Sequence, residues 1–373
     1  FFNRYQELFY RLVLFFAFSS VYASGNLKYE ILESFVYDSN IYQSNKNLIS
    51  SGISSTQLFI DYLSQIPNST LKFGLGTNVG YNAYTENNSK NNYMNAGLNI
   101  SLKNDYFNFH NSFIYTSEQA SNALTERAER INNEVFFNFR TKMEKMLSIG
   151  VIVSDVVDHY LKSEEDLLSR NRFNAGLQFF YNISPKTSIF VEDIVSFINY
   201  EKINVNNSTE NSLALGIDGN VTAKLSGNIK VSYDKRDYEK NNVETANILG
   251  YVAQLVYEPT AMMSITIVGK RKMEETAYAQ NRYYIGTGGD LLITKNLFRK
   301  LDTSLMLSYE NMLYPYGVTK REDNFYRIRP SVSGQLFEKF LVTVWYQFKD
   351  RQSDIEVMKY SDNMVGLDLK FSF

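Results

Sequence analysis

An alternation of apolar and polar residues with a period of two runs along this chain from about residue 27 to the last residue. In the final segment, apolar residues occupy Val365, Leu367, Leu369, Phe371 and Phe373, with Gly366, Asp368, Lys370 and Ser372 between them. Successive side chains of a β-strand point to opposite faces, so each such segment is expected to form a strand with one apolar and one polar face. A soluble sandwich and a membrane barrel share this pattern, so alternation alone leaves both folds open.

Polar or turn-forming residues separate the alternating segments and define the expected strands. These lie at roughly 27–42, 53–64, 70–85, 91–103, 107–118, 130–142, 146–158, 170–183, 187–200, 210–223, 226–239, 243–258, 262–275, 281–295, 300–312, 322–337, 339–351 and 359–373. The chain therefore predicts one sheet of about 18 strands, within the range that bacterial outer-membrane barrels use.

The connections between these strands alternate in length. Short turns at 103–106, 184–186 and 258–260 alternate with longer polar loops such as 85–91, 119–129, 160–169 and 352–359. Short periplasmic turns, longer extracellular loops and an even strand number are typical of bacterial single-chain barrels, whereas a sandwich or propeller has no reason to sort its loops in this way. The expected fold is all-β: a closed up-and-down antiparallel transmembrane barrel of 16–18 strands. The first connection, 43–52, is long, which places both termini on the periplasmic side.

The N-terminal segment has the order of a secretory signal peptide. Arg4 and Arg11 precede an apolar run at 12–18, and small residues follow up to Ala23. This order predicts cleavage after Ala23, with a signal peptide at 1–23 and a barrel domain at 24–373. The apolar run is too short for a membrane-spanning helix. A short amphipathic helix of the mature protein is the alternative.

The C-terminal segment has features of an assembly signal. Leu369, Phe371 and Phe373 are apolar residues at every second position up to the end of the sequence. This ending resembles the terminal signature that the outer-membrane barrel assembly machinery recognises. We therefore expect that machinery and outer-membrane lipid as partners, and Leu369, Phe371 and Phe373 as the assembly signal.

Composition supports a membrane setting. Aromatic residues make up 15% of a chain whose charged residues make up 21%, and Tyr and Phe favour the membrane–water boundary. The formal net charge of −2 gives no basic excess that would indicate nucleic acid. The sequence contains no cysteine, which excludes disulfides and thiolate metal sites.

Several short segments at strand ends resemble those of a known family. They are Tyr37-Asp38-Ser39-Asn40-Ile41-Tyr42, Arg236-Asp237-Tyr238, Arg321-Glu322-Asp323-Asn324-Phe325-Tyr326, Asp350-Arg351-Gln352-Ser353 and Tyr360-Ser361-Asp362-Asn363. In their order the chain is similar to the putative β-barrel porin 2 family, with departures at Ser39 and Gln352. The resemblance implies an outer-membrane barrel associated with exopolysaccharide production and export, and no catalytic residues.

The polar face of the strands supplies the candidate functional residues. By alternation, the pore-lining candidates are Lys72, Asn78, Asn82, Glu118, Glu192, Asp218, Lys230, Asp234, Arg236, Asp290, Asp302, Glu310, Arg327, Arg329, Asp368 and Lys370. Both charge signs occur without a one-sided ring, which predicts weak ion selectivity. The alternative is that these charges pair across the interior as structural struts.

On this resemblance, the expected function is a pore that serves as a conduit for exopolysaccharide export, with polysaccharide and export-system proteins as partners. The rival interpretations are a general diffusion porin for small solutes and a non-conducting structural or adhesion barrel. Tyr-rich and Asn-rich lumen positions would suit sugar hydroxyls.

We do not expect an enzyme, although one short motif contains residue types that can form a catalytic pair. His110 and Ser112 lie two residues apart on one strand face, and a base beside a hydroxyl can form a nucleophile pair. The spacing is similar to that of outer-membrane phospholipase A, whose pair faces lipid, whereas here Phe109 and Phe113 would take the lipid side. His159 has no second histidine near it in sequence. We therefore expect no catalytic residue, no metal site and no cofactor.

Overall fold

The computed structural model describes residues 25–66, 69–118, 127–142, 146–162, 166–239, 244–276, 281–298, 300–316 and 320–373. The predicted signal peptide lies outside the described residues, so its cleavage stays a prediction. Among the described residues, no helix is both long and apolar enough to cross a membrane.

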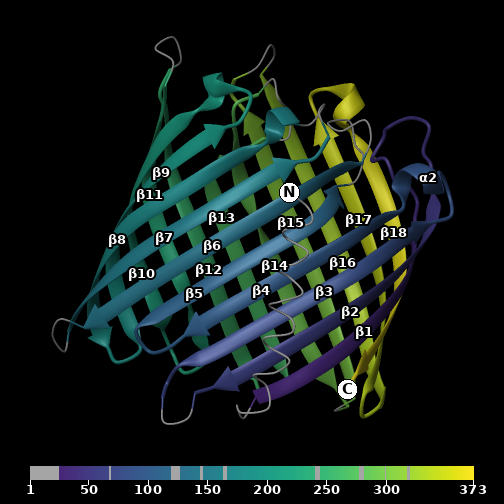
Figure 1. Ribbon diagram of the computed structural model, residues 1–373, viewed down its shortest axis with the longest axis horizontal. Helices are drawn as coiled ribbons and strands as arrows, with labels where there is room; N and C mark the ends of the chain where they lie inside the picture. Colours follow the sequence, from purple (N-terminus) through teal and green to yellow (C-terminus); the bar gives the residue numbers. More distant parts are fainter. Residues whose placement is uncertain are drawn as a thin grey trace, which may run out of the picture.

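The chain forms one 18-stranded antiparallel sheet (Figure 1). The strands are β1 (Gly25–Asp38), β2 (Ser51–Gln65), β3 (Lys72–Tyr84), β4 (Tyr93–Lys103), β5 (Phe107–Glu118), β6 (Ala128–Lys142), β7 (Leu147–Tyr160), β8 (Arg170–Ser184), β9 (Thr187–Tyr200), β10 (Ser208–Asn220), β11 (Leu225–Tyr238), β12 (Ala246–Thr260), β13 (Met263–Glu274), β14 (Tyr284–Leu297), β15 (Leu301–Tyr314), β16 (Arg321–Phe337), β17 (Phe340–Ser353) and β18 (Tyr360–Ser372). Each strand pairs with its neighbours in sequence, so the predicted up-and-down order is confirmed.

The first and last strands close the sheet into a barrel. β1 pairs with β18 in a register that runs from Glu30 opposite Ser372 to Asp38 opposite Met364. Closure leaves no edge strand with unpaired backbone groups, which is the condition for a sheet to exist in lipid. The predicted fold class is therefore confirmed.

The two ends of the barrel differ in their connections, as the loop lengths predicted. At one end, the short-turn end, tight turns such as 104–106, 185–186 and 261–262 join the strands, and the C-terminus lies there (Figure 1). The other end, the loop end, carries the short helices α2 (Asn88–Asn91), η1 (Asp166–Leu168), η2 (Asn204–Asn206) and η3 (Glu356–Met358). The β1–β2 connection belongs to the loop end, so β1 begins at the same end as the C-terminus.

One predicted strand boundary is wrong by four residues. The first strand was expected to reach residue 42, but β1 ends at Asp38. The reason is local: the Asp38 carboxylate accepts a hydrogen bond from the backbone N–H of Asn40 at 2.8 Å, which turns the chain. Such side-chain turns compete with the backbone hydrogen bonds between strands, and the alternation of apolar and polar residues alone does not detect them.

The outer face of the barrel carries the apolar band that the alternation predicted. Its members include Phe73, Leu98, Leu215, Leu307 and Val344, each on the face opposite the polar residues of its strand. Leu215 is 59% exposed and Val344 52% exposed, which suits side chains that lie in lipid. Among the described residues, most of the largest fully buried side chains are polar ones such as Arg236, and the buried apolar residues form small clusters such as that of Ile248, Met273 and Tyr283.

The C-terminal residues lie on the outer surface at the short-turn end. The Phe373 N–H donates to the Tyr29 carbonyl at 2.8 Å, and the Phe371 ring stacks on Phe340 with centroids 4.4 Å apart. Phe373 itself is 61% exposed, so its side chain contributes little to packing within the barrel.

Replacement of Phe373 by Ser is expected to lower the yield of assembled barrel severalfold. Because the side chain is largely exposed, a large loss would come from recognition during assembly rather than from lost packing. The heat-modifiable band of the membrane fraction on a gel measures the yield. Phe337→Ser is the matched control, since Phe337 is 73% exposed in the neighbouring β16–β17 region. Wild-type yield of Phe373→Ser protein would contradict the assigned role.

Candidate functional site

The interior of the barrel is the surface on which the strands bring the predicted residues together. Residues opposite one another in an antiparallel pair share a face, and the registers connect all eighteen strands into one closed circuit. By these registers every pore-lining candidate named above lies on the inner face. One of them, Arg236, is nearly inaccessible at 1% exposure. That these residues line an open pore stays a prediction.

The most deeply buried charges form a cluster at the loop end. In this arginine–carboxylate cluster, arginines from β8 and β11 contact acids from β7, β10 and the segment after β13; the residues are Arg170, Arg172, Arg236, Asp158, Glu210 and Glu275. Arg236 is 1% exposed, and its Nε and Nη2 groups donate to Glu210 Oε2 at 2.9 and 2.6 Å. Glu210 Oε1 accepts from Arg172 at 2.8 Å. The Glu210 carboxylate thus binds two arginines from different strands and links β8, β10 and β11 at the loop end.

Glu275 enters the cluster from outside the sheet. It follows the last residue of β13, and its Oε1 lies 2.8 Å from Nη1 of Arg236. Its Oε2 accepts a hydrogen bond from the Tyr200 hydroxyl at 2.5 Å. Burial opposes ionisation of this carboxyl, but the nearby arginines, Arg236 first, outweigh burial and lower the pKa of Glu275. The carboxylate therefore stays charged inside the barrel at neutral pH.

A second buried charge cluster lies at the loop end of β16, β17 and β18. Asp323 is fully buried between Arg321, at 3.0 Å, and Arg351, whose Nε donates to it at 3.2 Å. The equally buried Asp362 lies 3.4 Å from Lys349 Nζ. All of these residues except Lys349 belong to the strand-end segments that carried the family resemblance, so those segments supply buried ion pairs at the loop end.

The Asp-x-Asn segment after β1 joins the two ends of the sheet. Asn40 is fully buried; its Nδ2 donates to the Ser44 carbonyl at 2.8 Å and to the Ser361 carbonyl at 3.0 Å, and its Oδ1 accepts from the Ser44 N–H at 3.0 Å. Ser39 Oγ donates to Asp362 at 3.3 Å and accepts from the Asn363 N–H at 2.8 Å. We call residues Ser39, Asn40, Ser44, Ser361 and Asn363 the seam latch. It holds the loop after β1 against β18 where the barrel closes.

Several predicted lumen charges pair with one another at mid-height. Lys230 lies 2.6 Å from Glu192, which also accepts from Gln178 at 2.7 Å. Arg327 lies 3.6 Å from Asp290. These pairs therefore favour the alternative that the inner-face charges pair with one another as structural struts.

Other candidates have partners outside the predicted set. Glu310 lies 3.1 Å from Lys270, and Lys370 lies 2.9 Å from Glu30. Asp368 accepts from the Trp345 indole at 2.9 Å, and Arg329 lies over the Trp345 ring at 4.3 Å. The predicted positive patch of Arg327 and Arg329 thus contains one paired and one ring-stacked guanidinium.

The remaining candidates make fewer contacts with charged groups. Asp234 accepts from the hydroxyls of Ser212 and Ser232 at 2.5 and 3.1 Å. Asn82 is buried at 7% exposure, whereas Lys72 is exposed at the short-turn end. Asn78 lies opposite Gly97 in the register of β3 and β4. Glu118 ends β5 opposite Ala128. Asp302 accepts from Asn296 at 2.7 Å, and Asp218 lies at the short-turn end.

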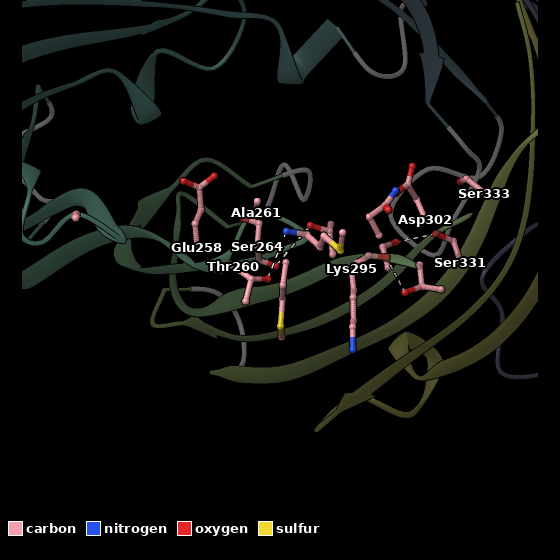
Figure 2. Close-up of a pocket in the computed structure, with 15 residues that line it drawn as sticks. Glu258, Thr260, Ala261, Ser264, Lys295, Asp302, Ser331 and Ser333 are labelled. Carbon is pink, nitrogen blue, oxygen red and sulfur yellow. Dashed lines mark hydrogen bonds between the residues drawn. The ribbon is translucent and has the colours of Figure 1, made fainter. Parts of the chain in front are cut away.

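A cavity of about 660 Å³ lies at the short-turn end against β13–β16, and hydroxyl groups dominate its inner wall (Figure 2). Figure 2 shows Ser264, Asp302, Ser331 and Ser333 around it, while Lys295 extends to the other side of the sheet. Ser331 hydrogen-bonds Ser304 at 2.7 Å, and Ser333 hydrogen-bonds Thr343 of β17 at 2.8 Å. This hydroxyl pocket offers donors and acceptors without a dominant charge.

The histidine motif has no catalytic geometry among the described residues. His110 and Ser112 lie on the inner face, opposite Phe136 and Glu134, and no hydrogen bond joins them within the described part of the chain. His159 instead lies 3.2 Å from Glu201 at the exposed loop end. In the described ranges, no group of three potential metal ligands occurs.

Sequence reasoning missed the residues that contribute most to the buried clusters. Arg172 and Glu210 occupy alternate polar positions of their strands, so full use of the alternation would have included them. Glu275 lies beyond its strand, where the period of two ends, and no local signal places it inside the barrel. Arg140, an inner-face residue of β6, was also missed although its position in the alternation is clear.

Comparisons with known proteins agree with this geometry. The family described as putative beta-barrel porin 2 matches residues 162–373. No curated protein matches the chain.

Solved outer-membrane channels share the fold. OccAB4 of Acinetobacter baumannii is 11% identical with a TM-score of 0.50, covering 94% of this chain and 98% of that one. OpdK of Pseudomonas aeruginosa, solved with vanillate, is 8% identical with a TM-score of 0.52, covering 93% and 99%. OccK2 (OpdF) of the same organism is 7% identical with a TM-score of 0.52, covering 94% and 98%. At these identities the likeness concerns the fold alone.

Proposed function

Because this chain belongs to the putative β-barrel porin 2 family and is a bacterial outer-membrane barrel, we propose that it is a water-filled conduit for hydrophilic solutes. The observation that carries the proposal is the inner face, where most strands carry charged or hydrogen-bonding side chains, among them Glu192, Lys230, Asp290 and Arg327. Barrels of 16–18 strands are wide enough to hold an aqueous channel. If the interior only stabilised the sheet, polar groups would not be needed at both the short-turn end and the loop end of the barrel.

Within this function, we propose that the cargo is an exopolysaccharide chain on its way out of the cell. The family resemblance supports this cargo, and so does the hydroxyl pocket at the short-turn end. Hydroxyl groups such as those of Ser331 and Ser333 both donate and accept, which suits sugar hydroxyls better than ions. A diffusion porin for small solutes is the second candidate, since the mid-height ion pairs resemble a lining of mixed charge with weak selectivity.

Purified protein in a planar bilayer is expected to give discrete ion conductance with weak selectivity. The double variant Arg327→Glu/Arg329→Glu is expected to shift the reversal potential towards cations, because two positive groups on one lumen face become negative. The shift should shrink at molar salt, where the screening length falls to about 3 Å.

The charge-preserving variant Arg327→Lys/Arg329→Lys is the control, and its reversal potential should match that of the wild type. A wild type that never conducts, even after loop deletion, would contradict the conduit and favour a structural or adhesion barrel. Conduction with an unchanged reversal potential in the Glu variant would place the selectivity-determining charges elsewhere in the lumen.

A further inference from the structure

The β13–β14 hairpin separates from the neighbouring β12 at the loop end. β12 and β13 pair only as far as Tyr251 opposite Arg271, although each strand continues beyond that pair towards the loop end. Over these residues β12 stays paired with β11, and β13 stays paired with β14. The wall is therefore split between β12 and β13 at this end. We call the described residues 272–276 and 281–285 of this hairpin the hairpin end.

The apolar side chains of the hairpin end pack inside the barrel. By register, Met273 and Ile285 share the outer face with the exposed Ile267 of β13, yet they are only 3% and 9% exposed. They belong to one apolar cluster with Ala246 and Ile248, which lie on the inner face of β12. Side chains of the outer face can join a cluster with side chains of the inner face only if the hairpin end bends inward over β12.

One carboxylate of the hairpin end reaches strands that are not its neighbours in the sheet. Glu275 Oε1 lies 2.8 Å from Nη1 of Arg236 on β11 and 4.0 Å from Nη1 of Arg172 on β8. Glu275 Oε2 accepts a hydrogen bond from the Tyr200 hydroxyl on β9 at 2.5 Å. This single side chain therefore connects the hairpin end to three strands across the split in the wall.

Two tyrosines place the hairpin end between two arcs of the inner wall. Tyr283 is 3% exposed and stacks on Tyr238 of β11, with ring centroids 6.5 Å apart. The next residue, Tyr284, packs against Tyr314 of β15 with centroids 5.3 Å apart. Tyr238 and Tyr314 both lie on the inner faces of their strands. The hairpin end therefore stands inside the barrel at the loop end, between β11 and β15.

We propose that the hairpin end is a movable gate at the loop-end mouth, held in its inward position by Glu275. Two positions are available to it. The inward position has the ion pairs of Glu275 and the apolar cluster, whereas the outward position would extend the pairing with β12, which has no partner on that side beyond Tyr251 among the described residues. An element with two such positions is shifted by any change that acts on one of them. The inference rests on the proposed conduit, because outward movement would widen the mouth for a bulky hydrophilic solute.

Labelling of a single cysteine measures the position of the hairpin end without requiring conduction. The chain contains no cysteine, and Thr276, next to Glu275, is 4% exposed. Thr276→Cys should therefore react slowly with a charged, membrane-impermeant thiol reagent. Adding Glu275→Gln should raise the labelling rate about tenfold or more, because hydrogen bonds to charged groups contribute at least that factor to an opening equilibrium.

Glu274→Gln is the matched control. The Glu274 carboxylate lies 3.1 Å from Lys270 of its own strand, so its loss does not release the hairpin end from β11. Added to Thr276→Cys, this change should leave the labelling rate near that of Thr276→Cys alone. In a planar bilayer, Glu275→Gln should conduct severalfold more than the wild type, and Glu274→Gln should not. Each variant is first checked for heat-modifiable mobility.

The two measurements separate the gate from the conduit. Fast labelling of Thr276→Cys with Glu275 intact, or an unchanged rate after Glu275→Gln, would overturn the proposed hold on the hairpin end. Faster labelling without higher conductance in a conducting barrel would overturn the role as a gate. Faster labelling of the Glu275→Gln barrel supports the movable hairpin end even if no variant conducts, in which case only the conduit proposal fails.

Discussion

Replacing Glu210 by Ala is expected to destabilise the barrel by roughly 3 kcal/mol, because it leaves a buried arginine without its main partner. Arg236 is 1% exposed and loses two hydrogen bonds of 2.9 and 2.6 Å, and Arg172 loses one of 2.8 Å. Glu275 remains as a single counter-charge. Urea unfolding of the refolded protein, followed by heat-modifiability, measures the change.

An exposed ion pair on β11, the strand that carries Arg236, provides the matched control. Lys235 and Asp237 lie 2.7 Å apart with side chains about half exposed, so Asp237→Ala should cost less than about 1 kcal/mol. Adding Arg236→Met to Glu210→Ala should recover little of the loss, because it removes the unpaired guanidinium but leaves the buried Glu275 carboxylate without its nearest arginine. Equal destabilisation by Glu210→Ala and Asp237→Ala would show that burial does not set the energetics of this cluster.

Replacing Asn40 by Ala is expected to open the seam between β1 and β18 at the loop end. The variant loses three hydrogen bonds of the seam latch and leaves the Ser44 N–H and the Ser361 carbonyl without this partner. At about 1 kcal/mol for each hydrogen bond, the loss should be roughly 3 kcal/mol. Hydrogen exchange should become faster in the paired ends of β1 and β18 and stay unchanged in β9 and β10.

Asn45→Ala is the control for the seam. Asn45 lies in the same loop and donates to the Glu356 carbonyl at 2.8 Å, but this contact is exposed. Its loss should leave the exchange of β1 and β18 near that of the wild type, because water replaces an exposed partner. If Asn40→Ala exchanges uniformly faster over all strands, the latch stabilises the whole barrel rather than its seam.

The inward or outward orientation of strand residues followed from the sequence because it depends only on local geometry. A period of two assigns Leu215 to lipid and Lys230 to the interior without knowledge of any neighbour. The same reasoning placed Phe109 and Phe113 outside and His110 inside. Loop lengths were equally informative, since they identified the end at which each pair of strands turns. The boundary at Asp38 was missed because a side-chain turn, rather than the alternation, ends β1.

What only the tertiary structure decided is which inner-face groups meet. Glu275 reaches Arg236 and Tyr200 from beyond its strand, and Asn40 joins residues 321 positions away in the sequence. These contacts depend on the stagger between strands and on the path of the loops at the end of the barrel. Neither feature produces a periodic pattern in the sequence. The sequence by itself determined which face of the barrel wall each strand residue occupies, whereas the tertiary structure determined which of the inner-face charges are paired.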